Sequence, residues 1–109
     1  MQIDLINSKV YNENNIKIVK KLIIDCFVNK AEWYRKPLIN TVVKQLGLSS
    51  EVLKDKSYNS IFTKCKSLIG SVINDMINDG YLYLDDRKIL VLLKDIKVII
   101  QEDDVTNYI

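Results

Sequence analysis

The sequence of 109 residues contains no histidine. Histidine supplies the base of Ser-His-Asp and Cys-His hydrolases, many zinc ligands and most pH switches near neutrality, so these chemistries are excluded here. The two cysteines, Cys26 and Cys65, are too few for a zinc site made of cysteine alone. Each falls in an apolar helical pattern, where a free thiol behaves as a small buried hydrophobe. A disulfide between them is an open alternative, but without a signal peptide two thiols fit a reducing cytosol.

Proline, glycine and long apolar runs are also scarce. One proline and three glycines exclude a collagen-like chain and a low-complexity linker. The longest apolar run, Ile89–Leu93, has five residues, whereas a membrane-spanning helix needs about 20. We therefore expect a cytoplasmic protein, nucleoid-associated if bacterial, with no membrane segment. It is expected to be no enzyme, with no cofactor, no metal and no small-molecule substrate.

The composition is that of an ordinary globular domain, with 48% apolar and 28% charged residues. A chain of this length buries about two-thirds of its unfolded surface, enough for one core. We expect a single domain over residues 1–109, with its core at about 14–94 and flanking segments 1–13 and 95–109.

Two shorter segments show apolar residues at helical spacing. The first is Ile16–Val28, preceded by the polar run Asn12–Asn15, which could cap it. The second begins at Pro37, because proline is tolerated in the first turn of a helix, and ends before Gly47. Both are predicted to be helices.

The strongest helical pattern is Tyr58–Asp79, with Ser57 as its expected start cap and Gly80 as its stop. About 22 residues would make a helix some 33 Å long. A short helical turn capped by Ser49 or Ser50 is expected just before it.

After the long helix the period of the pattern changes. Tyr81–Leu84 and Ile89–Leu93 are aromatic or apolar, and the four polar residues Asp85–Lys88 separate them, which predicts a β-hairpin. Asp95–Gln101 could be a third strand or a short helix, and Gln2–Leu5 is weakly strand-like.

Helices followed directly by a hairpin are the layout of a winged helix-turn-helix domain. The predicted fold is therefore mostly α with a small β-hairpin (α+β), as a winged helix. A plain helical bundle with an additional hairpin is the alternative.

Four segments between Ile18 and about Leu92 resemble the winged-helix domain at the N-terminus of Mrr-type restriction endonucleases. They are Val42–Ser49, similar to that family's helix followed by Leu-Gly-Leu-Ser; Phe62 and the residues behind it, similar to the start of its long helix; Ile77–Leu82, similar to the close of that helix; and Asp85–Lys88, where the family has a basic hairpin tip. The resemblance implies DNA binding more than it implies restriction.

The nuclease domain of that family follows its winged helix and carries an acidic–(D/E)-x-K metal site. Only about 20 residues follow the hairpin in this sequence, so no such domain is expected. Asp86–Lys88 and Asp95–Lys97 fit D-x-K, but such short matches arise by chance in a chain that is 28% charged.

Charge is unevenly distributed along the sequence. Residues 1–66 hold 12 Lys and Arg against six Asp and Glu, whereas residues 67–109 hold four against eight. A basic half is an electrostatic footprint for phosphates. The alternative is that the lysines only solvate the helices.

Projected at about 100° per residue, the long helix has an apolar stripe centred near Cys65 and Val72. The opposite side, called here the polar face, consists of Ser60, Thr63, Ser67, Gly70, Ser71 and Asn74. Small polar side chains suit base edges in the major groove, and flanking lysines suit phosphates. Because the N-terminal turn leads in helix-turn-helix docking, the candidate contacts are Tyr58, Asn59, Ser60, Thr63, Lys64, Lys66 and Ser67. Any amphipathic helix also presents a polar outer side.

Two further pairs of cations are candidate phosphate contacts. Arg87 and Lys88 lie at the predicted hairpin tip, although Asp85 and Asp86 beside them repel phosphate unless they turn back to cap the turn. Arg35 and Lys36 follow Trp33-Tyr34 just before a helix N-terminus, an arrangement that could clamp a phosphate. The alternative is that Trp33 packs on the core and the two cations are solvated.

Together these patterns predict a non-enzymatic protein that binds double-stranded DNA as a transcriptional regulator or DNA-organising factor. A homodimer is also expected, since apolar residues in both flanking segments could pair across a two-fold axis. The alternative is a winged helix used for protein–protein contact or dimerisation without DNA binding.

Overall fold

The computed structural model describes residues 9–46 and 56–93, and for 56–61 the backbone alone. In this part of the chain three helices and three short strands follow one another in the order α1, β1, α2, α3, β2, β3. The expected α+β class, mostly helical with a small antiparallel sheet, is confirmed. The elements are α1 Glu13–Asn29, β1 Glu32–Tyr34, α2 Arg35–Gln45, α3 Lys56–Asn78, β2 Leu82–Leu84 and β3 Ile89–Leu92.

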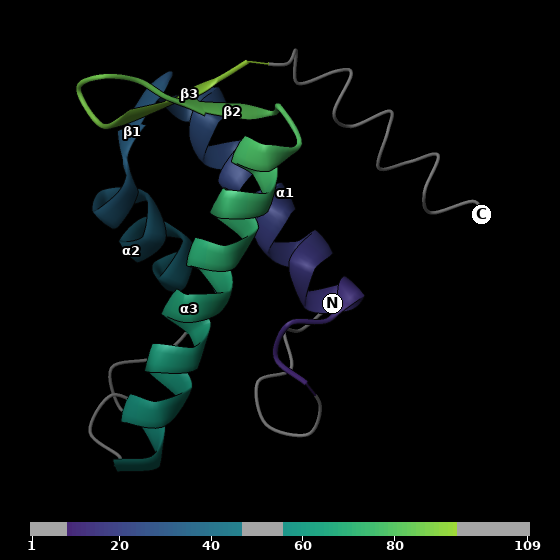
Figure 1. Cartoon of the computed structure of the whole chain (residues 1–109). Helices are drawn as coiled ribbons and strands as arrows, with labels where there is room; N and C mark the ends of the chain where they lie inside the picture. The colour runs from purple at the N-terminus through teal and green to yellow at the C-terminus, as the bar shows by residue number, and fades with distance from the viewer. Residues whose placement is uncertain (1–8, 47–55, 94–109) are drawn as a thin grey trace.

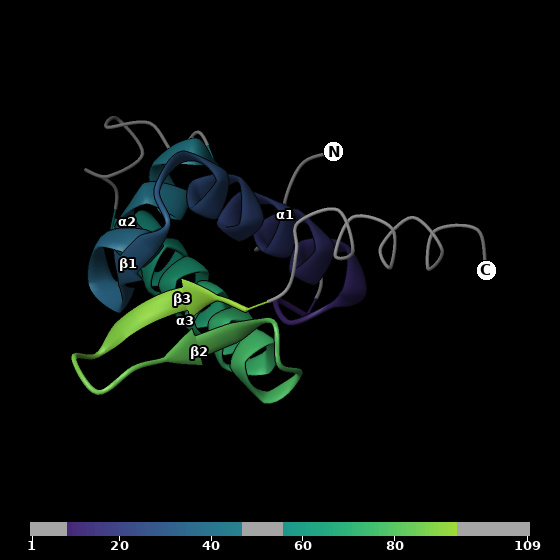
Figure 2. The ribbon, with the colours of Figure 1, turned by 90° about the horizontal axis from the view of Figure 1, so that it is seen from above.

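The helices pack against one another, and the sheet lies at one end of them (Figures 1 and 2). α3 runs through the middle of the molecule with α1 and α2 beside it (Figure 1). Its C-terminal end meets the sheet, whereas its N-terminal turns project beyond the other two helices, away from the sheet (Figure 1).

The start of α1 and the end of α3 follow from local sequence, although α1 begins at Glu13, three residues before the predicted Ile16. Asn12 is the N-cap of α1, where its side-chain oxygen accepts a hydrogen bond from the backbone N–H of Asn15 at 2.9 Å. Gly80 adopts φ +83° just after α3, a left-handed conformation that glycine enters without strain. The backbone N–H of Tyr81 then reaches back to the carbonyl of Met76, which closes the last turn.

The starts of α2 and α3 differ from the prediction. α2 begins at Arg35, two residues before Pro37, so Pro37 still falls in the first turn, where no backbone N–H is needed. α3 begins at Lys56, one residue before Ser57, which therefore lies inside the helix and does not cap it. The predicted turn at Ser49 or Ser50 and the stop at Gly47 lie outside the described residues.

The sheet contains the predicted hairpin and one strand that the sequence did not predict. β2 pairs with β3 around the loop Asp85–Lys88, and β1 pairs with the other edge of β3, giving the order β1-β3-β2. Tyr34 lies opposite Ile89, and Tyr83 lies opposite Val91. The two further strand candidates, Gln2–Leu5 and Asp95–Gln101, fall outside the described residues.

Apolar side chains from all three helices and from β2 and β3 form one core. Ile69 and Ile73 of α3 are fully buried between Ile23 of α1 and the residues of α2 and the hairpin. Cys26 and Cys65 are both buried and free, as expected for small hydrophobic side chains, and no disulfide joins them. Among the described helices, none is long and apolar enough to cross a membrane.

Candidate nucleic-acid interface

The apolar stripe of α3 is buried, which leaves its polar face turned outward. Thr63, Lys64 and Ser67 are exposed on the N-terminal half of the helix. Lys66 is half-buried, with its Nζ 4.6 Å from the centre of the Phe62 ring. The backbone of Tyr58, Asn59 and Ser60 lies in the first turns of α3, but the side chains of these three candidates lie outside the description.

Arg35, one of the predicted phosphate contacts, is exposed and lies against one side of the polar face. From the first residue of α2, its Nη2 donates to the carbonyl oxygen of Gly70 at 3.1 Å and its Nη1 donates to Oδ1 of Asn74 at 3.0 Å. Gly70 is itself buried. Arg35 therefore contacts two members of the polar face, Gly70 and Asn74.

The N-terminal segment Lys9–Asn12, called here the strap, borders the other side of α3. The side chain of Asn15, which is fully buried, donates to the Val10 carbonyl at 2.8 Å. The Tyr11 hydroxyl donates to the Asp75 carboxylate, and this bond raises the pKa of Tyr11 above its usual value. α1 and α3 thus both hold the strap.

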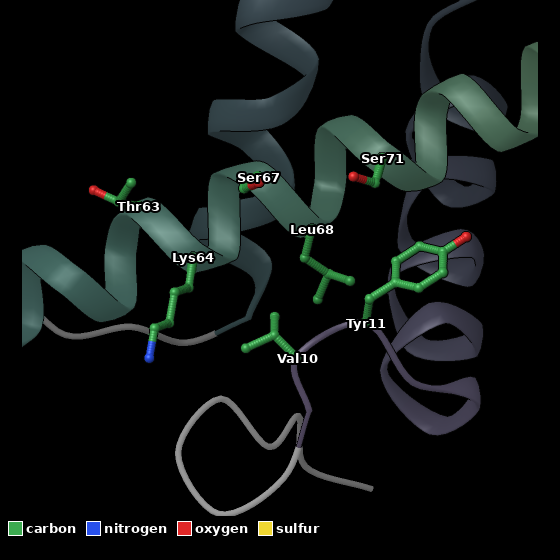
Figure 3. Close-up of a pocket in the computed structure, with 7 residues that line it drawn as sticks. All are labelled: Val10, Tyr11, Thr63, Lys64, Ser67, Leu68 and Ser71. Carbon is green, nitrogen blue, oxygen red and sulfur yellow. The ribbon is translucent and has the colours of Figure 1, made fainter.

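The strap and Arg35 lie on different sides of the helix. Asp75 follows Asn74 by one position, or about 100° around α3. A hollow of about 300 Å³ lies on the strap side, lined by Val10, Tyr11, Thr63, Lys64, Ser67, Leu68 and Ser71 (Figure 3). The exposed candidates of the N-terminal half, Thr63, Lys64 and Ser67, are among the residues that line this hollow.

Trp33 and Lys36 take different positions, and for Trp33 the alternative to a phosphate clamp, packing on the core, is the one observed. Trp33 packs against the core, and its Nε1 donates to the carbonyls of Cys26 at 3.1 Å and Lys30 at 3.0 Å. Lys36 is exposed on α2. Gln45, at the other end of α2, faces α1, where it accepts a long hydrogen bond from Cys26 Sγ. Lys36 precedes Gln45 by nine positions, or about two and a half helical turns, so the two side chains point to opposite sides of α2. Lys36 therefore lies on the edge of α2 away from α1.

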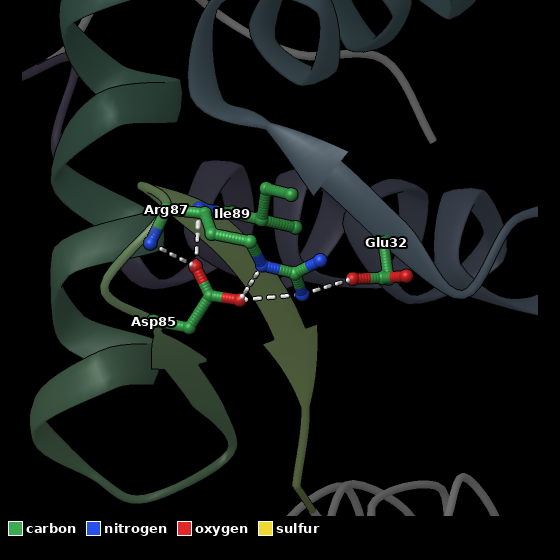
Figure 4. Close-up of polar contacts among 4 residues, drawn as sticks. All are labelled: Glu32, Asp85, Arg87 and Ile89. Atoms are coloured by element: carbon green, nitrogen blue, oxygen red, sulfur yellow. Dashed lines mark hydrogen bonds and ion pairs between the residues drawn. The ribbon is translucent and has the colours of Figure 1, made fainter.

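At the hairpin tip, Arg87 is held by two carboxylates (Figure 4). Its Nη2 lies 2.8 Å from Asp85 and 2.9 Å from Glu32 of β1. Asp85 also accepts hydrogen bonds from the backbone N–H groups of Ile89 and Arg87, both at 2.9 Å. It therefore turns back and caps the turn, which was one of the two alternatives for this residue. The bond from Ile89, followed by those from Arg87, holds the pKa of the Asp85 carboxyl below its usual value.

These ion pairs change the charge that the hairpin tip presents. Glu32 and Asp85 neutralise Arg87, and Asp86 is exposed beside them. Lys88 is exposed at the end of the turn, where it adopts φ +67°. Of the two predicted cations at the tip, Lys88 is the one not engaged by these carboxylates.

The described residues as a whole carry an excess of positive charge, with 13 Lys and Arg against 7 Asp and Glu. Within the same residues, no group of His, Cys, Asp or Glu could hold a metal ion. The surface thus favours anionic partners in general, as far as the described part shows.

Comparison with protein-family models, with curated proteins and with solved structures finds no match to the chain.

Proposed function

We propose that this chain is a winged helix-turn-helix protein that binds double-stranded DNA, as a transcriptional regulator or DNA-organising factor. The order α1-β1-α2-α3-β2-β3, with β1 closing the sheet beside the hairpin, supports this fold because it is the layout of such domains. α2 and α3 would form the helix-turn-helix, and β2 and β3 the wing.

The observation that carries the proposal is the position of Thr63, Lys64 and Ser67. They are exposed on the N-terminal half of α3. A recognition helix enters the major groove with its N-terminal residues leading, so short hydroxyl side chains would face base edges while a lysine contacts a phosphate.

The neighbouring contacts narrow the proposed reading surface. Asn74 accepts a hydrogen bond from Arg35, so we leave it out of the proposed reading surface. Arg35 acts by holding α2 against α3, and Lys36 and Lys88, two of the predicted phosphate contacts, are exposed outside α3.

Fluorescence anisotropy of a labelled AT-rich duplex, measured at several salt concentrations, tests the proposal. Binding should be micromolar or tighter at low salt and should weaken steeply as salt rises, because displaced counterions drive it. Lys64→Ala and Lys66→Ala should each lower the salt slope by about one. Lys21→Ala is the matched control, since Lys21 is exposed on α1 and should leave the slope unchanged.

Two results would contradict the proposal. No binding at about 50 mM salt would remove the phosphate attraction on which all DNA binding depends. A slope that falls equally with Lys21→Ala and Lys64→Ala would show general attraction without a defined surface.

A second candidate function is protein contact through the outer side of the sheet, with a second copy of the chain as partner. Tyr34 and Tyr83 are 57% and 50% exposed, and their pairing with Ile89 and Val91 places all four side chains on one face. Three strands of three or four residues cover only about 200 Å², well below the roughly 800 Å² per partner of a stable interface. The sheet alone would therefore give weak association, and we rank it second.

Sedimentation equilibrium tests this second candidate. A concentration-dependent dimer that Tyr83→Ser weakens would support it, and a monomer throughout the micromolar range would exclude it.

A further inference from the structure

The hollow between the strap and α3 is partly open to solvent. Its volume of about 300 Å³ lies at the lower end of small-molecule pockets and equals the liquid volume of about ten waters. A small molecule of about ten non-hydrogen atoms would fit it.

One wall of the hollow is apolar. The side chains of Val10, Tyr11 and Leu68 approach one another below α3 (Figure 3). Leu68 is buried, and the Tyr11 hydroxyl is turned to Asp75, so the ring is what Tyr11 offers to the hollow. A fully hydrated inorganic anion would gain nothing from this wall, whereas a compact hydrocarbon or aromatic body would.

The other wall carries hydrogen-bond donors. Ser67 and Ser71 contribute hydroxyl groups, and Lys64 contributes an ammonium group at the edge of the hollow (Figure 3). These three groups take part in no hydrogen bond or ion pair in the described part of the chain. Two hydroxyls and one cation beside an apolar wall match an anionic head on an apolar body.

The strap gives the site a fixed shape. Asn15 holds the Val10 carbonyl from below, and Tyr11 is tied to Asp75 of α3. A wall that is already in place loses little conformational entropy when a ligand binds.

We propose that this hollow binds a small amphipathic carboxylate and that its occupation hinders DNA from reaching α3. The second half rests on the proposed function, because Thr63, Lys64 and Ser67 line the hollow and are also the proposed DNA contacts. A ligand that engages Lys64 and Ser67 removes the same donors from DNA, so the two bind in competition.

Benzoate is a suitable probe, with benzyl alcohol as its uncharged counterpart. We expect saturable amide chemical-shift changes in ¹⁵N-labelled protein, confined to residues around Val10, Tyr11, Ser67 and Ser71. The midpoint should be in the millimolar range, as about nine non-hydrogen atoms permit. Benzyl alcohol should bind at least about five-fold more weakly, because it lacks the charge that Lys64 attracts.

Three variants locate the site. Ser71→Leu should fill the hollow and abolish the benzoate shifts, whereas Asn78→Leu, an exposed change later on the same helix, should keep them. Lys64→Gln should weaken the binding of benzoate without changing the binding of benzyl alcohol. This variant tests the site even if Ser71→Leu fails to fold. Shifts that never saturate, that spread over the whole protein, or that survive Lys64→Gln undiminished would overturn the site.

The regulatory half is tested by duplex anisotropy with sodium benzoate against sodium chloride at equal ionic strength. Benzoate should raise the dissociation constant of the duplex several-fold more than chloride does, and Ser71→Leu should remove that difference. Saturable benzoate binding without any duplex binding would keep the ligand site and refute the proposed function. Duplex binding without saturable benzoate binding would keep the proposed function and refute the ligand site. Equal effects of sodium benzoate and sodium chloride on duplex binding would overturn the regulatory half.

Discussion

Arg35 donates a hydrogen bond from its guanidinium to the carbonyl oxygen of Gly70 across the α2–α3 interface, at 3.1 Å. Gly70 has no side chain, and a Cβ built there would lie 3.1 Å from the same Nη2 atom, tighter than most packed contacts. The missing side chain therefore leaves the room that the guanidinium occupies. Arg35 thus joins α2 to α3. The proposed function requires these two helices to keep a fixed relative position.

The first prediction is that Arg35 and Gly70 are energetically coupled. Alanine is favoured over glycine inside a helix by about 1 kcal/mol. Gly70→Ala should show this gain in an Arg35→Ala background, because only Arg35 meets the new Cβ. In the wild-type background the new Cβ displaces the Arg35 guanidinium, and the weakened hydrogen bond should offset most of this gain in stability. A double-mutant cycle by urea unfolding should give a coupling of about 0.5–1.5 kcal/mol, and a value within about 0.3 kcal/mol of zero would refute it.

The second prediction concerns the buried amide that holds the strap. Asn15→Ala should lower the free energy of unfolding by about 1–3 kcal/mol, since it leaves the Val10 carbonyl without this partner. Asn14→Ala is the matched control, because Asn14 is exposed on the same turn and should cost less than about 0.5 kcal/mol. Equal effects of the two changes in urea unfolding would show that burial of the amide is unimportant.

The third prediction separates the two cations at the hairpin tip. Arg87 is already paired with Glu32 and Asp85, so Arg87→Ala should change the salt slope of DNA binding by much less than one. Lys88→Ala should lower the slope more, because Lys88 is not engaged by these carboxylates. Glu32→Gln should strengthen binding, since it removes a negative charge and releases part of the guanidinium. If Arg87→Ala lowers the slope by a full unit, the ion pairs open when DNA binds.

The fourth prediction is a loss of stability in acid caused by Asp85. Its carboxyl has a pKa below the value of about 3.9 in an unfolded chain, mainly because it accepts the Ile89 N–H bond. A lowered folded pKa means that the contribution is complete above the unfolded pKa and disappears as pH falls through the folded pKa. Asp85→Asn should therefore flatten the decrease in Tm below about pH 4.

Asp86→Asn is the control for this measurement, because Asp86 is exposed at the same tip and accepts none of the turn bonds formed by Asp85. An unchanged pH dependence in Asp85→Asn, or an equal change in both variants, would contradict the assignment.

The fifth prediction is that Cys65 is chemically inert in the folded protein. Burial raises the pKa of its thiol to about 11, so very little thiolate exists near pH 8. In a Cys26→Ala variant, Ellman's reagent should react with Cys65 at least about 100-fold more slowly in buffer than in denaturing urea. Comparable rates in the two conditions would show that the helix around Cys65 opens readily.

The helices could be predicted because local rules determine them. Apolar residues at intervals of three and four mark the buried sides of α1, α2 and α3, and Gly80 ends α3 as expected. The change to a shorter period after Gly80 predicted the hairpin, which needs only neighbouring residues to form.

β1 could not be predicted, because nothing in Glu32–Tyr34 itself requires a strand. Three residues are too few to show a period, and their partner, β3, lies about 55 residues further along the chain. The same holds for Arg35, whose acceptors on α3 became visible only when α2 was placed. The burial of Asn15 could not be predicted either, because the residue type alone does not distinguish a buried asparagine from an exposed one. Long-range contacts thus decided which predicted phosphate contacts are free and which are engaged.

The pairing of β1 with β3 also constrains the order in which the protein acquires its structure. β1 leaves the ribosome long before Ile89, its partner for Tyr34, has been made. α1 and α2 can form by local contacts at that stage, but the first edge of the sheet has to wait for nearly the whole described chain. Closing so large a loop is entropically unfavourable before the helices have packed. We infer that the helices and the local β2–β3 hairpin form first and that the pairing of β1 with β3 completes the sheet last.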